Sequence, residues 1–293
     1  MASDTSLWTS TPWQPHPHGH HKPSIPYLPA SYHLQTLSVW IPSTGSQPPP
    51  DIPTASGTWI IYLHGGAWRD PRIDSLSFSA TASHILSSSP PGKLAGLISP
   101  NYRLSPHPSF PSNTNVAHHP DHITDVIHAI AFLQRLGIAE EYILVGHSCG
   151  ATLAFQTVMG SARWGLDTKI IKPKTVVGVN GLYDLVGFIE APPKGFEGLR
   201  EAYEEFTRGA FGSDRDVWRG ACPTTTEKRW VGEWEVVLAQ SEEDGLVPRG
   251  QLVGLRHRLE GDGIVVREAS IGGEHDGVWE RGEELAGILV GLI

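Results

Sequence analysis

The chain has 293 residues, of which 39% are hydrophobic and 18% charged, as in ordinary globular proteins. Its 22 Lys and Arg residues and 31 Asp and Glu residues give a net charge of −9, and no basic block interrupts this acidic balance. Composition therefore argues against binding to nucleic acid or to an anionic membrane surface.

Cysteine content and apolar segments favour a cytoplasmic protein. Cys149 and Cys222 are the only cysteines, which excludes a disulfide scaffold and favours a reducing compartment. The N-terminal residues have neither the cationic start nor the apolar core of a secretory signal. The longest apolar stretch, residues 285–293, is too short to span a bilayer. We therefore expect a cytoplasmic location and no membrane partner.

Residues 1–35 are rich in Pro, His and Ser, with scattered aromatic side chains. This composition is typical of an extended arm laid over a surface, or of a partly disordered segment. His18, His20 and His21 could bind a metal in principle, but nothing fixes their geometry, so a solvated polar tract is favoured. We expect residues 36–293 to form a single domain, and we leave open whether the arm closes a homodimer.

From Thr58 onward, short apolar runs alternate with helical patterns. The β-branched run at residues 58–63 predicts a buried strand. Residues 121–137 carry Ile and Val at helical spacing and end in a glycine, which predicts a helix. Further strands and helices are expected within residues 93–104, 141–146, 150–160, 174–185, 235–248, 249–263, 264–277 and 278–292.

This alternation predicts an α/β fold with a mostly parallel central sheet and helices on both faces. Residues 187–230 break the rhythm, because they are polar and carry adjacent prolines and several aromatic side chains. We expect them to form a small cap over the carboxyl edge of the sheet.

Ser148 lies at the centre of a G-x-S-x-G pattern that spans Gly146 to Gly150. An apolar strand precedes this pattern and a helix of small residues follows it, which is the context of a nucleophile held in a strained turn. The glycines are needed where neighbouring backbone comes too close for a Cβ. The alternative is a glycine-rich turn whose serine only caps the helix. The pattern in its context predicts that Ser148 is a nucleophile.

The segment from His64 to Trp68, "HGGAW", follows a predicted strand directly. Its glycines Gly65 and Gly66 leave backbone N–H groups free to point at a developing oxyanion, and the N–H of Cys149 would be a further donor. An ordinary turn between strand and helix is the alternative. We expect His64 to brace the loop and Trp68 to form a wall of the substrate pocket.

A serine nucleophile needs a base, and the base needs an orienting carboxylate. His275 follows the last predicted strand in a glycine-rich loop, whereas His257 lies inside a predicted helix beside two arginines. Asp244 follows a strand and is the expected acid, with Asp184 as its rival. We expect solvated or supporting roles for the remaining acidic residues near these loops: Glu242, Glu243, Glu274 and Asp276.

Residues 118–125 contain residue types that bind metals. They include His118, His119, Asp121, His122 and Asp125, but Pro120 interrupts the run. Loop bracing and acidic residues at a helix start explain them without a metal. We expect neither a metal nor an organic cofactor.

These motifs together resemble a known family. "HGGAW", "NYRLSPHPSFP" and "GHSCGA" are similar to the esterase branch of the α/β-hydrolase fold that is related to hormone-sensitive lipase. "HPDHITDV", "GLYDL", "EDGLVP" and "GGEHDG" add a likeness to the kynurenine formamidase (arylformamidase) family. The likeness runs from about residue 58 to residue 277. Ala67 stands where many esterases have a third glycine, which makes a general esterase less favoured.

The resemblance implies hydrolysis of N-formyl-L-kynurenine to L-kynurenine and formate, a step of tryptophan breakdown and of NAD synthesis. It implies no metal and no organic cofactor, and a small-molecule substrate as the partner. Because formyl is the smallest acyl group, we expect a narrow acyl pocket. Two alternatives stay open: a general carboxylesterase of the same fold, and a non-catalytic homologue that binds a small ligand.

Overall fold

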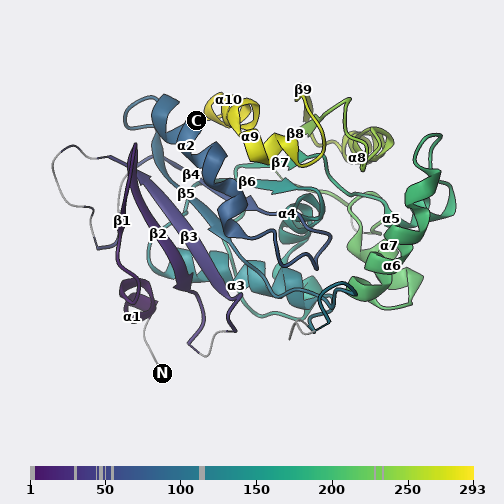
Figure 1. The fold of residues 1–293 in the computed structure, drawn as a ribbon, viewed down its shortest axis with the longest axis horizontal. Helices are drawn as coiled ribbons and strands as arrows, with labels where there is room; N and C mark the ends of the chain where they lie inside the picture. The colour runs from purple at the N-terminus through teal and green to yellow at the C-terminus, as the bar shows by residue number, and fades with distance from the viewer. Residues whose placement is uncertain are drawn as a thin grey trace.

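The architecture is a nine-stranded sheet covered by helices (Figure 1). It is seen in a computed structural model that describes residues 4–29, 32–43, 45, 49, 51–53, 56–111, 116–227, 229–232 and 234–293. The strand order is β1-β2-β3-β5-β4-β6-β7-β8-β9. The strands are β1 (Gln14–His16), β2 (Gly19–Pro26), β3 (Thr36–Pro42), β4 (Thr58–Leu63), β5 (Leu94–Pro100), β6 (Tyr142–His147), β7 (Thr175–Val179), β8 (Glu235–Gln240) and β9 (Val266–Ser270).

The six strands from β4 to β9 pair in parallel, and β1, β2 and β3 form an antiparallel extension beyond β5. Parallel neighbours place their carboxyl ends at one edge of the sheet, so the loops that follow them meet there. The predicted fold, a mostly parallel sheet flanked by helices, is confirmed.

Two apolar layers enclose the sheet because alternate side chains of each central strand point to opposite faces. In β4, Ile61 packs into the core on one face and Ile60 into the core on the other. Both faces are buried, which explains the nearly continuous apolar runs in the sequence. The first face carries α3 (Asp121–Arg135), α4 (Cys149–Met159) and α8 (Gly250–Gly261), and the second carries α2 (Ser79–Ser88), α9 (Gly277–Arg281) and α10 (Glu283–Val290).

The N-terminal segment, expected as an arm, is extended in β1 and β2, and these strands hydrogen-bond to the edge of the sheet. A short helix, α1 (Asp4–Thr9), precedes them. His21 stacks on Trp40 with ring centroids 4.5 Å apart, and the Lys22 ammonium lies 5.6 Å from the ring centroid of Trp8. Pairing with β3 and aromatic stacking therefore hold this polar segment on the domain.

Residues 185–221 form a small helical layer beyond the carboxyl ends of the parallel strands (Figure 1). Its helix α6 (Arg200–Phe211) buries Tyr203, Phe206 and Phe211 on one face. The Tyr203 hydroxyl donates a hydrogen bond to the carbonyl oxygen of Leu246, in the loop after β8, at 2.8 Å. The segments are α5 (Leu185–Glu190), η3 (Glu197–Leu199), α6 (Arg200–Phe211) and α7 (Arg215–Ala221), and we call them the cap.

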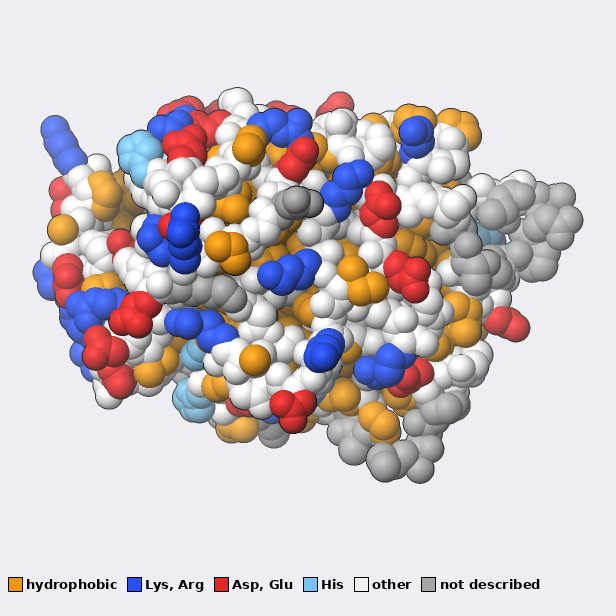
Figure 2. Space-filling view, turned by 180° about the vertical axis from the view of Figure 1, so that it is seen from behind, with side chains coloured by type: hydrophobic (Ala, Val, Ile, Leu, Met, Phe, Trp, Pro, Cys, Tyr) orange, Lys and Arg blue, Asp and Glu red, His pale blue; other side chains and the backbone are white. Residues whose placement is uncertain are grey.

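The outer surface mixes charges of both signs. Figure 2 shows Lys and Arg side chains interspersed with Asp and Glu over the face seen there. Ion pairs on the surface of the described chain include Arg249 with Glu268 at 2.7 Å and Arg267 with Glu235 at 3.0 Å. Within the described part of the chain, no helix combines the length and apolar character needed to cross a bilayer.

Candidate active site

Ser148 lies between β6 and α4 in a turn that few residues adopt. Its φ of 55° and ψ of −122° fall in a region that is strained for a side chain with a Cβ. A Cβ added to Gly146 would lie 2.2 Å from the carbonyl oxygen of Gly150, and one added to Gly150 would lie 2.2 Å from that of Leu63. The close packing of β4, β6 and α4 therefore requires both glycines.

The glycine loop after β4 faces this turn. Within the described part of the chain, no backbone carbonyl oxygen accepts a hydrogen bond from the N–H groups of Gly65, Gly66 or Cys149. The Tyr102 hydroxyl donates to the carbonyl oxygens of His64 at 2.9 Å and Gly65 at 3.1 Å, which fixes these peptide groups. Burial lowers the pKa of His64 to about 4, so its ring is neutral where it stacks on Tyr102. His64 therefore braces the loop.

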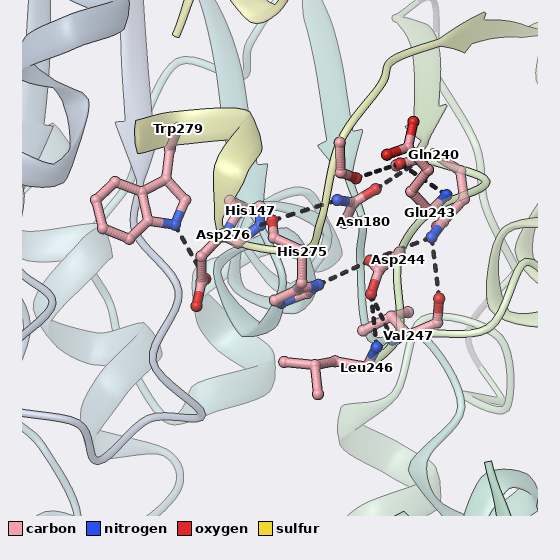
Figure 3. Close-up of polar contacts among 12 residues, drawn as sticks. His147, Asn180, Gln240, Glu243, Asp244, Leu246, Val247, His275, Asp276 and Trp279 are labelled. Carbon is pink, nitrogen blue, oxygen red and sulfur yellow. Dashed lines mark hydrogen bonds and ion pairs between the residues drawn. The ribbon is translucent and has the colours of Figure 1, made fainter. Parts of the chain in front are cut away.

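His275 and Asp244 come together from loops that follow β9 and β8 (Figure 3). His275 Nδ1 lies 2.7 Å from Asp244 Oδ2. The other oxygen, Asp244 Oδ1, accepts hydrogen bonds from the backbone N–H groups of Leu246 and Val247, both at 2.8 Å. The carboxylate therefore has one oxygen held by the backbone and one directed at the imidazole. Both residues are buried, with exposures of 7% for His275 and 6% for Asp244.

Two polar residues at the ends of neighbouring strands hold the His275 loop in place (Figure 3). His147 Nε2 lies 3.0 Å from the carbonyl oxygen of His275, and the Asn180 amide donates to the same oxygen at 3.4 Å. Asn180 Oδ1 also accepts from the N–H of Ser241, at 2.9 Å. Burial, together with the neighbouring His275, lowers the pKa of His147 well below its ordinary value.

His147 and Asn180 are not among the functional residues that the sequence motifs predict. Both are polar residues at the carboxyl end of a buried parallel strand, β6 for His147 and β7 for Asn180. Side chains at this edge of a parallel sheet commonly belong to the site. That position was the available signal.

A cavity of about 260 Å³ opens above this group, between the sheet edge and the cap. Ser148, His275 and Gly66 form part of its wall, and Tyr203 and Phe206 of α6 form the apolar cap side. No hydrogen bond joins the Ser148 and His275 side chains within the described structure, although both line this cavity. Such contacts are often loose without a bound substrate.

Cys149 and Trp68 support the glycine loop from below. The Trp68 N–H donates to Cys149 Sγ at 3.3 Å, and burial raises the pKa of the Cys149 thiol to about 11. The Trp68 ring is fully buried and meets the Phe211 ring edge to face, at 4.9 Å between centroids. The sequence predicted that Trp68 would form a wall of the substrate pocket. Trp68 is not among the described residues that line the cavity, so its ring packs behind them.

The other candidates for base and acid lie elsewhere. Asp184 begins α5, where its Oδ1 accepts a hydrogen bond from the N–H of Gly187 at 2.8 Å. His257 is exposed on α8, beside Arg256. Three acidic side chains near the candidate loops are exposed: Glu242, Glu243 and Glu274.

The histidines that precede α3 contact the cap. His118 Nδ1 lies 2.8 Å from the carbonyl oxygen of Gly209, and the N–H of His119 donates to that of Ala210 at 2.7 Å. The His119 ring also packs on Phe211, with centroids 5.0 Å apart. These residues therefore join the start of α3 to α6.

The remaining metal-like residues of α3 also have protein partners. His122 Nε2 lies 2.9 Å from Ser105 Oγ, and burial lowers the pKa of this histidine to about 3. Arg103 forms ion pairs with Asp125 at 2.8 Å and with Asp121 at 3.3 Å. Each side chain is thus accounted for by a contact that positions the loop before α3.

One group in the described part of the chain has the spacing of a metal site. Potential ligand atoms of His147, His275 and Asp276 lie within 4.8 Å of one another. These residues already hold other contacts, because His275 is bonded to Asp244 and Asp276 Oδ1 accepts from the Trp279 indole N–H at 3.1 Å. His147 Nε2 also has a partner already, because it lies 3.0 Å from the carbonyl oxygen of His275.

Comparisons with known proteins agree on one family. No protein-family model matches the chain. It is 38% identical to a kynurenine formamidase-like hydrolase of Fusarium equiseti, over 92% of this chain and 93% of that protein. It is 35% identical to a kynurenine formamidase of Aspergillus versicolor, over 77% and 84%, and 33% identical to one of Meyerozyma guilliermondii, over 73% and 72%.

Solved structures of esterases share the fold. Esterase B from Lactobacillus rhamnosis superposes with a TM-score of 0.73 at 16% identity, over 99% of this chain and 87% of that one. A carbohydrate esterase from gut microbiota gives a TM-score of 0.68 at 17% identity, over 94% and 96%. At such identities the likeness concerns the fold, whereas the relatives above establish the family. The chain belongs to the kynurenine formamidase family.

Proposed function

We propose that this protein hydrolyses N-formyl-L-kynurenine to L-kynurenine and formate, with Ser148 as nucleophile, His275 as base and Asp244 as orienting acid. The observation that carries the proposal is the 2.7 Å contact between His275 Nδ1 and Asp244 Oδ2, beside a cavity that Ser148 also lines. The names of the curated relatives supply the substrate.

Ser148 Oγ attacks the formyl carbon while His275 Nε2 takes the hydroxyl proton. The carbonyl electron pair moves to the oxygen, and the N–H groups of Gly65, Gly66 and Cys149 stabilise this oxyanion. Loss of one such donor costs about 3 kcal/mol of transition-state stabilisation in serine hydrolases. Asp244 keeps the His275 proton on Nδ1, so that Nε2 is free to accept. Substrate binding closes the gap between Ser148 and His275.

The tetrahedral intermediate then collapses. Its C–N bond breaks, and His275 gives the proton to the departing aryl amine, which leaves as L-kynurenine. A water molecule attacks the formyl ester on Ser148 while His275 takes one of its protons. When the bond between carbon and Ser148 Oγ breaks, the proton returns to the serine, and the released formic acid loses its own proton to solvent to give formate. These steps use only groups of the chain, the substrate and water.

The small cavity suits a small acyl group. Its volume of about 260 Å³ lies below the range of about 300–1,000 Å³ typical of ligand sites. Tyr203 and Phe206 of the cap provide an apolar wall for the aromatic ring. We expect p-nitrophenyl acetate to be turned over faster than the butyrate ester. Equal or faster turnover of butyrate would contradict a narrow acyl pocket and would favour a general carboxylesterase.

The direct test is turnover of N-formyl-L-kynurenine by the purified protein, followed by the absorbance of L-kynurenine. A fluorophosphonate probe should label the wild type and not Ser148→Ala. Labelling of both proteins would remove Ser148 as nucleophile, and labelling of neither would favour a ligand-binding homologue. The proposal includes a cytoplasmic location, supported by two free, buried cysteines and tested by cell fractionation.

A further inference from the structure

The cavity has a charged region beside the glycine loop. Arg69 follows that loop directly, and it is the only Lys or Arg among the described residues that line the cavity. Its side chain is only 13% exposed. Its guanidinium carbon lies 5.9 Å from the centroid of Phe206, a residue of the apolar wall. A fixed positive charge therefore borders the space proposed for an aromatic substrate.

Arg69 is held by a carboxylate that approaches from outside the cavity. Its Nη1 and Nη2 lie 2.9 Å and 3.0 Å from the two oxygens of Glu205 on α6. Glu205 is 51% exposed and is not among the described lining residues. A guanidinium has five N–H donors, and this pair uses two. The others have no protein partner within the described part of the chain, so they are available to a ligand.

His107 adds a second donor to this region. It also lines the cavity, and its Nδ1 accepts a hydrogen bond from the N–H of Ser109 at 3.1 Å. In a neutral ring the proton therefore lies on Nε2. Burial, together with the charge of Arg69, lowers the pKa of His107, which favours this neutral form. No described residue accepts a hydrogen bond from Nε2.

The nearby carboxylate Asp70 does not cancel the positive charge. It lines the cavity as well, but Arg72 donates three hydrogen bonds to it, at 2.7 Å, 2.9 Å and 3.0 Å. The charge of Asp70 is thus balanced by a side chain outside the cavity. This arrangement leaves the unpartnered N–H groups of Arg69 as the strongest hydrogen-bond donors to an anion on the cavity wall.

We infer that Arg69 and His107 bind the α-carboxylate of N-formyl-L-kynurenine, the end of the substrate opposite the formamide. The inference rests on the proposed function. The Arg69 N–H groups left free by Glu205 receive the carboxylate, while Glu205 holds the guanidinium in position. A substrate without the carboxylate gains nothing from these donors, so the site selects formamides of amino acids over simple formanilides.

The test compares N-formyl-L-kynurenine with 2-formamidoacetophenone, which keeps the ring, the ketone and the formamide but lacks the amino-acid group. The measured quantity is the ratio of kcat/KM for the two substrates. A hydrogen bond to a charged group is worth about 1.5–3 kcal/mol, so Arg69→Met should lower this ratio about 10- to 100-fold, mainly through KM for formyl-kynurenine. Arg69→Lys keeps the charge but loses the planar fork and should give an intermediate ratio.

Two controls separate this role from others. Glu205→Gln removes the charge of the ion pair between loop and cap, but the glutamine amide oxygen can still accept a hydrogen bond from Arg69 and hold the guanidinium, so its ratio should stay at the wild-type value or rise. Arg208→Met removes an exposed positive charge of α6 that does not line the cavity, and it should leave the ratio within about threefold of wild type, because exposed charges act weakly at a distance.

If Glu205→Gln lowers the ratio of kcat/KM as much as Arg69→Met does, the role of Arg69 is to hold the cap through its ion pair. That result would overturn the inference. An unchanged ratio in both Arg69 variants would also overturn it. If the wild type turns over neither formamide, the proposed function fails instead. If it turns over both equally, formamide hydrolysis stands but carboxylate recognition does not. A folded Arg69 variant is verified by fluorophosphonate labelling of Ser148.

Discussion

Replacing Asp244 with asparagine tests the role of the carboxylate while keeping its shape. Asp244 Oδ1 accepts hydrogen bonds from the backbone N–H groups of Leu246 and Val247, both at 2.8 Å. A backbone N–H can only donate, so these two groups still require an oxygen acceptor in the variant. The oxygen of the new side-chain amide must therefore stay on that side, and its NH₂ group must face His275 Nδ1. An imidazole that accepts this hydrogen bond carries its own proton on Nε2, where it can no longer take the proton of Ser148.

The expected effect is large because the wrong tautomer dominates. The equivalent change in a serine protease lowers kcat about 10,000-fold, so we expect about a 1,000- to 10,000-fold loss here, or about 4–5.5 kcal/mol in the barrier. The assay is kcat for N-formyl-L-kynurenine under saturating substrate. Asp184→Asn is the matched control, because asparagine also caps a helix well, and it should retain near wild-type kcat. An Asp244→Asn enzyme within tenfold of wild type, or an equal loss in Asp184→Asn, would refute the reasoning.

Two further predictions concern stability. Gly146→Ala should destabilise the protein by about 3 kcal/mol or more, because the added Cβ would lie 2.2 Å from the Gly150 carbonyl oxygen, whereas Gly287→Ala on α10 meets nothing within 4 Å. Urea unfolding measures both, and similar stabilities would contradict the close packing. His122 is neutral in the fold, with a pKa of about 3, but titrates near 6.5 when unfolded. The contribution of His122 to the free energy of unfolding is complete above pH 6.5. It is lost as pH falls, by about 2 kcal/mol between pH 7.5 and 5. His122→Gln should flatten that dependence and exposed His257→Gln should not; parallel curves would refute the assignment.

The turn around Ser148 and the parallel sheet were predictable because their signals are local. Apolar runs of strand length and two glycines flanking a serine reflect contacts that any chain with this pattern must make. The pairing of His275 with Asp244 was also within reach, since each follows a strand and parallel strands bring such loops to one edge. Its distance and the two backbone donors on Asp244 needed the structure.

Other features depend on contacts between segments far apart in the sequence. Asn180 joins the loops of Ser241 and His275, and no local pattern encodes that contact. Trp68 was expected on the pocket wall, but α6 packs its Phe211 against the ring, and the position of α6 cannot be read from composition. The His-rich N-terminal segment looked like a solvated tract because its stacking partner, Trp40, lies on β3.

The hydrogen bond from Tyr203 to Leu246 has a consequence for how substrates enter. The N–H of Leu246 donates to Asp244, and its carbonyl oxygen accepts from Tyr203. One residue therefore connects the cap above the cavity to the carboxylate that contacts His275. A movement of α6 away from the sheet would break the contact between Tyr203 and Leu246, and would release the residue whose N–H donates to Asp244. Access of a ligand to the cavity and alignment of Asp244 with His275 thus depend on the same few atoms. The pair is best ordered when the cap covers the cavity.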